Sequence, residues 1–231
     1  MNIRVSRIGP GKAMLLLSAF AIFGVYGIGA EGFKVEGSVG LASPTMSVVF
    51  DSALGERITA ASSDLTCRID INLKKGESSG DCVIPLKSIS VDGHAQKSEH
   101  FYDWATNKKS DPEQCQIKFA WEQARAAGPI FENQPATFSV LGKFTVCGRA
   151  RDDQGKETVT GNLFLFPPGV RIETQALRIK AKVEGFNRER YGIGPKFTEG
   201  WVASVQRLAP VVGDEGTVDV TLFARPVKKS L

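Results

Sequence analysis

The side chains best suited to chemistry in this sequence are its two histidines and four cysteines. His100 follows Glu99 and lies near Asp103, and a neighbouring carboxylate can orient an imidazole as a general base. No nucleophile can be paired with it, and the sequence has no nucleophile elbow, phosphate loop, dinucleotide fingerprint or metal-binding helix motif. We therefore interpret His100 as a loop histidine and predict a protein that is not an enzyme and has no catalytic residues or cofactor. A hydrolase or redox enzyme that uses His100 or a cysteine is the less favoured alternative.

The cysteines fit disulfide bonds better than a metal site. None belongs to a C-x-x-C pair, and His94 and His100 lie six residues apart in a loop-like region, so we predict no metal ligands. An even number of cysteines in an exported chain is typical of two disulfides, for which three connectivities are possible. The four are Cys67, Cys82, Cys115 and Cys147.

A hairpin favours one of these connectivities. Turn signals at residues 127–135 lie midway between Cys115 and Cys147, so a hairpin centred near residue 131 would bring the two level. Alternation argues against this, because Cys115 shares a face with Ile117 whereas Cys147 shares the opposite one with Thr145. A β-bulge at Gly142, or a strand that begins after Cys115, would reconcile them. The favoured pairs are Cys67 with Cys82 and Cys115 with Cys147.

The N-terminal segment carries a targeting signal. Arg4, Arg7 and Lys12 stand in a stretch without acidic residues, and a mostly apolar run of eighteen residues follows from position 13 to 30. This order is typical of a signal peptide, and the small residues near position 29 or 30 offer a cleavage point. The alternative is an uncleaved anchor, since the run is near the lower limit for spanning a bilayer. We predict that residues 1–30 are a signal peptide and that the protein is periplasmic or secreted.

The charge of the sequence gives little support to a nucleic-acid role. Removing residues 1–30 takes three of the 29 basic residues and none of the 25 acidic ones, so the net charge falls from +4 to +1. No basic block remains apart from Lys228 and Lys229, and we predict no nucleic-acid partner. The remaining residues, 31–231, fit one domain with a substantial core.

Alternation of apolar and polar residues with period two dominates this domain and predicts half-buried antiparallel strands. Consecutive hairpins then imply a meander of about eight strands, which either closes into a barrel or stacks as a sandwich. The barrel is favoured. The predicted strands cover residues 46–50, 67–73, 83–91, 117–124, 136–146, 159–166, 177–184 and 217–222.

Two segments depart from the alternation. Residues 94–112 suit a short helix or turn, in which Phe101, Trp104 and Ala105 form an apolar face at i, i+3 and i+4. Residues 186–202 form a glycine-rich loop with four aromatic side chains. Gly213–Glu215 is predicted to be a turn before the last strand.

The segment VLGKFTVCGRA, residues 140–150, resembles the V-x-G-x-L-T-I-H-G signature of the YceI-like family. Five further positions besides Val140 fit the pattern, and Cys147 replaces its histidine. The segments HFYDW (100–104), CQIKF (115–119), GFNRERYGIG (185–194) and VVGDEGTVDV (211–220) are similar to the family in the same order. The positions that fit the signature are Val140, Gly142, Phe144, Thr145, Val146 and Gly148.

This resemblance implies an all-β, antiparallel, eight-stranded lipocalin-like barrel with a short helix between strands. It also implies an exported protein that holds a polyisoprenoid or similar amphiphilic chain inside the barrel, with the membrane only as source or destination of the lipid. The interior of such a barrel either is filled by side chains or holds one small ligand. A filled barrel that acts through its surface loops, in a stress-related or interaction role, is therefore the alternative, and a homodimer stays open.

The predicted lining is the apolar face of the strands, although each of these residues also suits an ordinary core. At the pocket mouth we place Phe101, Arg188 and Tyr191; Arg188 has a structural alternative, in which it binds a carboxylate or backbone carbonyls around a turn. Arg190 stands where the family has aspartate. The lining residues are Ile69, Ile71, Ile117, Phe119, Val140, Phe144, Leu163, Ile179, Val183, Val220 and Leu222.

Overall fold

A computed structural model describes residues 31–35, 43–107, 110–150, 155–169, 174–194 and 212–227. The predicted signal peptide lies outside these residues, as do Phe197 and Trp201 of the predicted glycine-rich loop. None of the described helices is long and apolar enough to cross a membrane. The elements are β1 (Glu31–Val35), β2 (Thr45–Ser52), β3 (Arg57–Ser62), β4 (Thr66–Asn72), β5 (Glu77–Pro85), η1 (Leu86–Ser88), β6 (Ser90–Val91), α1 (Ala95–Thr106), β7 (Gln116–Ala126), β8 (Pro135–Val146), β9 (Arg149–Ala150), β10 (Lys156–Phe166), β11 (Ala176–Asn187), η2 (Arg188–Tyr191) and β12 (Val212–Pro226).

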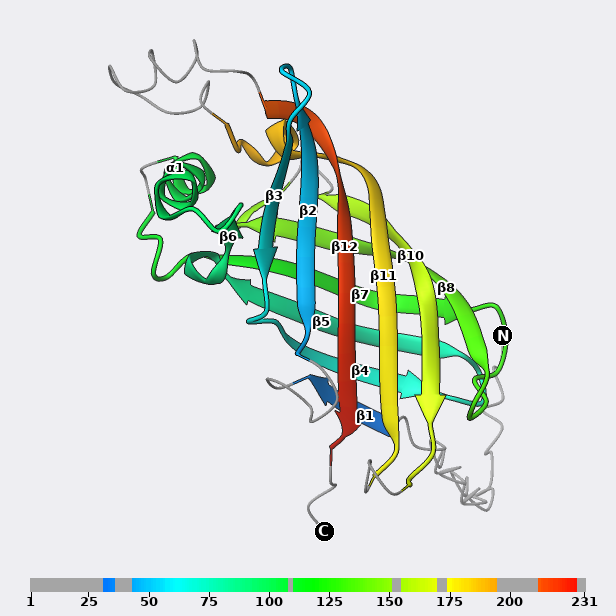
Figure 1. The fold of residues 1–231 in the computed structure, drawn as a ribbon. Coiled ribbons are helices and arrows are strands. Elements are labelled where there is room, and N and C mark those ends of the chain that lie inside the picture. Colours follow the sequence, from blue (N-terminus) through cyan, green and yellow to red (C-terminus); the bar gives the residue numbers. More distant parts are fainter. Residues whose placement is uncertain are drawn as a thin grey trace, which may run out of the picture.

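Eight of the strands form a closed antiparallel barrel (Figure 1). The ring runs β1-β4-β5-β7-β8-β10-β11-β12 and closes where β12 pairs with β1, through Phe33 opposite Pro226 and Lys34 opposite Arg225. From β4 onward, neighbours in the ring follow one another along the chain, as a meander requires. The predicted eight-stranded lipocalin-like barrel with a short helix is confirmed.

One edge of the last strand pairs with β11, and its other edge pairs with two different strands, which the sequence did not reveal. On that edge Val212 and the residues from Gly216 to Thr221 pair with β2, whereas Arg225 and Pro226 pair with β1. β2 pairs with β3, and β3 pairs with β6. These three strands therefore extend the sheet beside α1 (Figure 1). β1 and β3 were absent from the predicted strands because each is short and lacks a sustained alternation.

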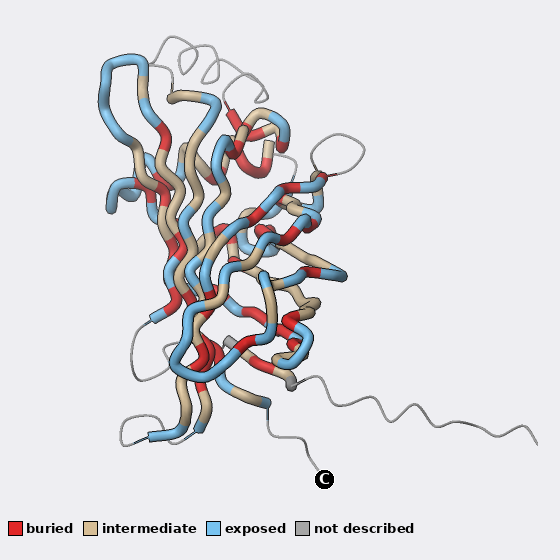
Figure 2. The backbone as a smooth tube through the Cα atoms, turned by 90° about the vertical axis from the view of Figure 1, so that its right-hand side faces the viewer, coloured by how far each residue is buried: buried red, intermediate tan, exposed pale blue. Residues whose placement is uncertain are grey.

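The alternation in the sequence correctly predicts which strand residues are buried and which are exposed in β4. Along β4, Cys67, Ile69 and Ile71 are buried while the residues between them are exposed. β10 alternates in a similar way, and Figure 2 shows buried and exposed positions interspersed along the strands. Most of the buried positions join one large hydrophobic cluster, and Ala124, Val140 and Val159 form a second, smaller one.

Two local predictions are wrong. Residues 83–91 are not one strand: β5 ends at Pro85, η1 follows, and β6 is separate, because proline has no N–H to continue a ladder. Gly213–Glu215 is not a turn before the last strand but part of β12, where the register with β2 shifts between Val212 and Gly216. This shift is a β-bulge, which bends the strand without ending it.

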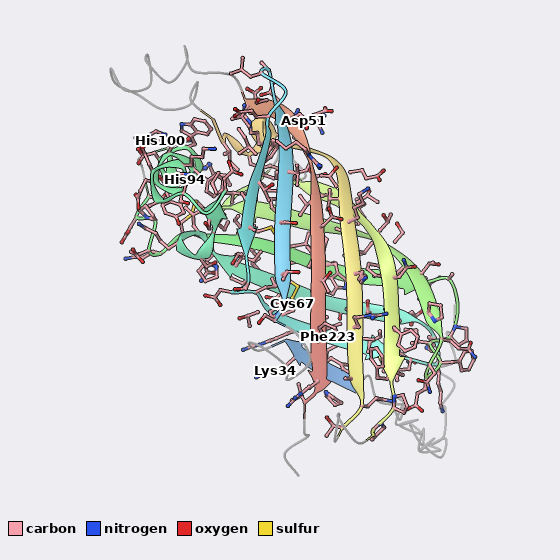
Figure 3. The ribbon with its side chains drawn as sticks, in the orientation of Figure 1. Lys34, Asp51, Cys67, His94, His100 and Phe223 are labelled. Atoms are coloured by element: carbon pink, nitrogen blue, oxygen red, sulfur yellow. A yellow bond between two sulfur atoms is a disulfide. The ribbon has the colours of Figure 1, made fainter. Side chains whose placement is uncertain are left out.

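Both favoured disulfides are present, and no described cysteine is free. Cys67 and Cys82 lie directly opposite on β4 and β5, with Cα atoms 4.1 Å apart (Figure 3 labels Cys67). Cys115 lies just before β7 and Cys147 just after β8, with Cα atoms 4.8 Å apart. Cys115 thus precedes the strand, as one of the two predicted explanations requires, and the β7–β8 ladder also has a register shift, between Ala120 and Ala124 on β7, opposite Gly142.

Candidate ligand-binding cavity

The barrel encloses a cavity of about 440 Å³, within the range of about 300–1,000 Å³ that is usual for small-molecule sites. On β7 the lining extends from Ile117 to Ala126, nine residues apart, which corresponds to about 30 Å along the strand. Most of the lining side chains are apolar. The space is therefore long, narrow and hydrophobic.

All eleven residues predicted to line the interior do line this cavity. The reason is that each lies at an inward position of its strand, so the alternation read from the sequence carries over into the barrel wall. Their role in binding a ligand remains a prediction. The eleven are Ile69, Ile71, Ile117, Phe119, Val140, Phe144, Leu163, Ile179, Val183, Val220 and Leu222.

Sequence reasoning missed the part of the wall that β2 and β3 contribute. Met46, Val48 and Phe50 line the cavity from β2, and Ile58 and Ala60 line it from β3. The alternation in β2 was visible, but only the pairing of β2 with β12 shows that this strand faces the cavity.

Glycines on the inner face explain how large rings can line the cavity without filling it. A Cβ atom added to Gly80 would lie 2.8 Å from the ring of Trp121, and one added to Gly161 would lie 2.9 Å from the ring of Phe138. Each ring thus occupies the space over a glycine of the adjacent strand. Gly142 with Phe119 and Gly216 with Phe50 repeat the arrangement. All four rings line the cavity.

Helix α1 is held against the barrel by one of its stripes. Ser98, Tyr102 and Ala105 are buried at i, i+4 and i+7. The Tyr102 hydroxyl lies 2.7 Å from the carbonyl oxygen of Ile89 and 3.1 Å from that of Lys87, and Ser98 Oγ accepts from the Val91 amide at 2.9 Å. The helix ends at Asn107, which adopts the left-handed conformation (φ 54°).

The adjacent stripe of α1 lines the end of the cavity. Lys97, His100, Phe101 and Trp104 lie at i, i+3, i+4 and i+7, and all four contribute to the lining. None of them is fully buried, so the cavity approaches the surface here. The prediction that Phe101 lies at the mouth agrees with this position.

Arg188 lines the same end of the cavity, but its donors are already engaged. Its guanidinium donates to the carbonyl oxygens of Val212, Gly213 and Ile193 at 2.7–3.0 Å and to Asp214 at 2.8 Å. Burial lowers the pKa of Arg188, and the carboxylates of Asp214 and Glu189 partly offset this effect. These contacts agree with the alternative interpretation of Arg188, in which it binds a carboxylate and backbone carbonyls. Through them Arg188 holds η2 against the start of β12.

Tyr191 does not lie at the mouth, contrary to the prediction. It is 1% exposed and is not among the lining residues. Its ring stacks on Phe186 with centroids 5.3 Å apart, and its hydroxyl donates to the buried Glu157 at 2.6 Å. An aromatic residue in a glycine-rich segment looks exposed in the sequence, but here η2 folds back and buries the ring.

The opposite end of the barrel is filled by side chains. Phe33, Leu165 and Leu177 are each 1% exposed or less and do not line the cavity. The segment between β7 and β8 folds over this end, where the buried Ile130 donates its amide to the carbonyl oxygen of Leu73 at 2.8 Å. The cavity therefore approaches the surface at the α1 end but not through this core.

The described residues contain no cluster of histidine, cysteine, aspartate or glutamate that could hold a metal ion. Both cysteine pairs are oxidised, so the predicted alternative of a cysteine-dependent enzyme lacks its thiol. The arrangement can enclose an apolar chain and contact a polar group at the α1 end.

Comparison with known proteins bears on the fold. The structure of a polyisoprenoid-binding domain from Saccharophagus degradans, implicated in plant cell wall breakdown, is similar with a TM-score of 0.54. The match has 13% sequence identity and covers 84% of this chain and 98% of that one. No protein-family model matches the chain, and no curated protein matches it. The similarity supports a shared barrel fold.

Proposed function

We propose that this chain is an exported lipid-binding protein of the YceI-like family. It holds a polyisoprenoid or a similar amphiphilic chain in the barrel for transport, storage or sequestration, and it is not an enzyme. The observation that carries this proposal is the long apolar cavity of about 440 Å³ inside the closed barrel. The fold shared with a polyisoprenoid-binding domain supports it.

The energetics suit a ligand that is mostly hydrocarbon. Each CH₂ group moved from water into such a cavity gains about 0.8 kcal/mol. A chain of several isoprene units therefore gains many kcal/mol without a dedicated polar contact, and ordering the chain offsets part of this. A filled barrel would leave no room for such a chain, so the cavity argues against the alternative of a protein that acts only through its loops.

Two features support export. The basic and then apolar order of residues 1–30 is that of a signal peptide. Disulfides such as Cys67–Cys82 and Cys115–Cys147 form and persist in oxidising compartments. A periplasmic or secreted protein would meet both conditions.

Native mass spectrometry tests the proposal directly. The protein is expressed with its N-terminal segment, purified from the periplasm without detergent, and extracted with solvent to identify anything released. We expect a stoichiometric prenyl or other long-chain lipid. A mass equal to that of the bare chain with two disulfides, together with no uptake of added isoprenoid, would contradict the proposal.

A further inference from the structure

The closed end of the barrel, where side chains fill the interior opposite α1, exposes large apolar side chains on its outer surface. It comprises the turn between β4 and β5, the segment between β7 and β8, the end of β10, and the paired ends of β1 and β12 (Figure 1). Phe131 is 58% exposed here, and the residue after it bridges to Leu165 at the end of β10. Val227, which follows β12, is 44% exposed, and its amide donates to the carbonyl oxygen of Gly32 on β1. Such groups mark an interaction surface where they belong to a larger patch.

Aromatic side chains extend this patch along the outer face of three neighbouring strands. Phe164 on β10 lies opposite Arg178 on β11, and Arg178 lies opposite Phe223 on β12. The guanidinium of Arg178 is 5.5 Å from the ring centroid of Phe164 and 5.5 Å from that of Phe166, within the range in which a ring attracts a cation. All four side chains are partly exposed. The patch therefore combines aromatic rings with positive charge.

Three basic residues lie directly opposite one another on the same outer face. Lys34 on β1 is in register with Arg225 on β12 at one side and with Arg68 on β4 at the other. Figure 3 labels Lys34 and Phe223 at this end of the barrel. Like charges at opposite positions of neighbouring strands destabilise a sheet by themselves. A negatively charged partner would relieve this repulsion, so the row favours such a partner.

The carboxylates described at this end do not cancel the charge of the row. Asp70, two residues beyond Arg68 on β4, lies beside it. Lys74 and Lys75 add exposed positive charge in the turn that follows β4, so the balance of charge at this end is positive. Three further carboxylates already have partners within the protein: Asp81 lies 3.7 Å from Lys118, Glu77 lies 3.3 Å from Arg125, and Glu132 accepts from the Gln175 amide at 2.8 Å.

We propose that the closed end of the barrel docks on the surface of a membrane that contains anionic lipids. The negative surface of such a membrane attracts basic side chains. Exposed apolar side chains such as Phe131 and Val227 then enter the boundary between head groups and acyl chains. The α1 end, where the cavity approaches the surface, faces away from the bilayer in this orientation. The inference goes beyond the proposed function and needs no ligand in the cavity.

Other partners fit only one half of this surface. A soluble polyanion would bind the basic row, but it offers no apolar phase to Phe131 and Val227. A second copy of this chain in a two-fold dimer would place the row of Lys34, Arg68 and Arg225 against itself, and the like charges would repel. A membrane with anionic lipids supplies both negative charge and an apolar phase.

Vesicle binding tests the proposal. The mature chain, residues 31–231, is floated with vesicles of phosphatidylcholine alone, or with vesicles of phosphatidylcholine and phosphatidylglycerol in equal amounts. We expect binding to the anionic vesicles to be at least about tenfold tighter than binding to the neutral ones, and to weaken as the salt concentration rises.

Charge variants locate the surface. Arg225→Glu should weaken binding to the anionic vesicles at least about tenfold, because it replaces an attracted charge with a repelled one. Lys156→Glu is the matched control, since it makes the same change of charge at the start of β10, towards the other end of the strand, and it should bind as the parent does. Both side chains are exposed, so the variants should fold.

Apolar variants test the contact with the acyl chains. Phe131→Ser should weaken vesicle binding by roughly fivefold, with the clearest effect at high salt, because the charge attraction is then screened. Leu54→Ser is the matched control: Leu54 is 69% exposed in the turn between β2 and β3, at the opposite end. Lipids with brominated acyl chains should quench the fluorescence added by Phe131→Trp but not that added by Leu54→Trp, which gives the orientation.

The outcomes separate this inference from the proposed function. Equal binding to neutral and anionic vesicles, or unchanged binding by Arg225→Glu, would overturn it. Binding of dextran sulfate as tightly as vesicles, with no effect of Phe131→Ser on vesicle binding, would also overturn it and identify a soluble polyanion as the partner. Mass spectrometry of the native protein measures lipid in the cavity separately, so either conclusion can fail without the other.

Discussion

Where β1 meets β12, Phe33 and Leu177 are buried to 1% or less, whereas at the α1 end partly exposed side chains such as Phe101 and Trp104 line a cavity. The long strands β10, β11 and β12 run through both ends, whereas β1 joins the wall at one end and β2 and β3 join it at the other. They differ in what stands at the inward positions. Large aliphatic and aromatic residues interdigitate at the β1 end, while glycines such as Gly80 and Gly142 accommodate rings against the wall of the hollow part. The comparison teaches that inward-facing does not mean space-filling.

The largest expected effect compares two positions on one strand. Leu177 and Ile179 both face inward from β11, but Leu177 is fully buried whereas Ile179 is half-buried and lines the cavity. Leu177→Ala should lower the free energy of unfolding by about 3 kcal/mol, and Ile179→Ala by about 1 kcal/mol, because a residue beside a void has fewer contacts to lose. Urea denaturation of the two variants measures the difference. Equal losses would show that the two ends are packed alike.

Removing the disulfides should destabilise the α1 end of the barrel most, because both lie near the strand ends that lead to η1 and α1. With sequence separations of 15 and 32 residues, Cys67–Cys82 and Cys115–Cys147 should contribute about 3 and 4 kcal/mol. Replacing both cysteines of a pair with serine, one pair at a time, tests these values by denaturation. Hydrogen exchange should rise first in α1 and only later in the strands around Leu177. A uniform rise would show that the disulfides do not act locally.

Filling the cavity should block ligand binding with a smaller effect on stability. Val140 on β8 faces the cavity, and its neighbour Leu141 is 55% exposed on the outer surface. Val140→Trp should weaken binding of a 20-carbon prenyl chain tenfold or more, or about 1.4 kcal/mol, because the ring occupies the space of the chain. Leu141→Trp is the matched control and should bind normally. Fluorescence titration gives both affinities, and unchanged binding by Val140→Trp would place the ligand elsewhere.

The smallest expected effect is a pH dependence of the α1 end. Burial acts to raise the pKa of Asp92, but the hydrogen bonds from Lys97 and the Thr59 amide together hold this pKa below its ordinary value of 3.8. Its contribution to stability is therefore full above pH 3.8 and is lost as the pH falls through the lower folded-state pKa.

We expect Asp92→Asn at neutral pH to reproduce this loss, at about 0.2–1 kcal/mol. Hydrogen exchange in α1 should increase in the variant and on acidification, while the core around Leu177 stays protected. If α1 were unaffected in both cases, the Asp92–Lys97 pair would not hold the helix to β3.

The sequence by itself determined which residues face inward, and among three possible connectivities it favoured the two cysteine pairs that the structure contains. Ile69, Val140 and Ile179 could be placed on the inner face because alternation is a local property of a strand. The pair Cys115 and Cys147 was favoured because turn residues place a hairpin between them, but the register of that hairpin and the start of β7 after Cys115 come only from the structure.

Only the tertiary structure decided that the interior is hollow, that β2 and β3 join the wall, and that Tyr191 is buried. Each of these depends on neighbours that are distant in sequence. Whether space remains depends on the volumes of side chains from eight strands at once, and on pairs such as Gly161 with Phe138, which only the register brings together. For the same reason, only the structure shows that Lys97 and His100 line the end of the cavity, because this depends on the packing of α1 against η1 and β6.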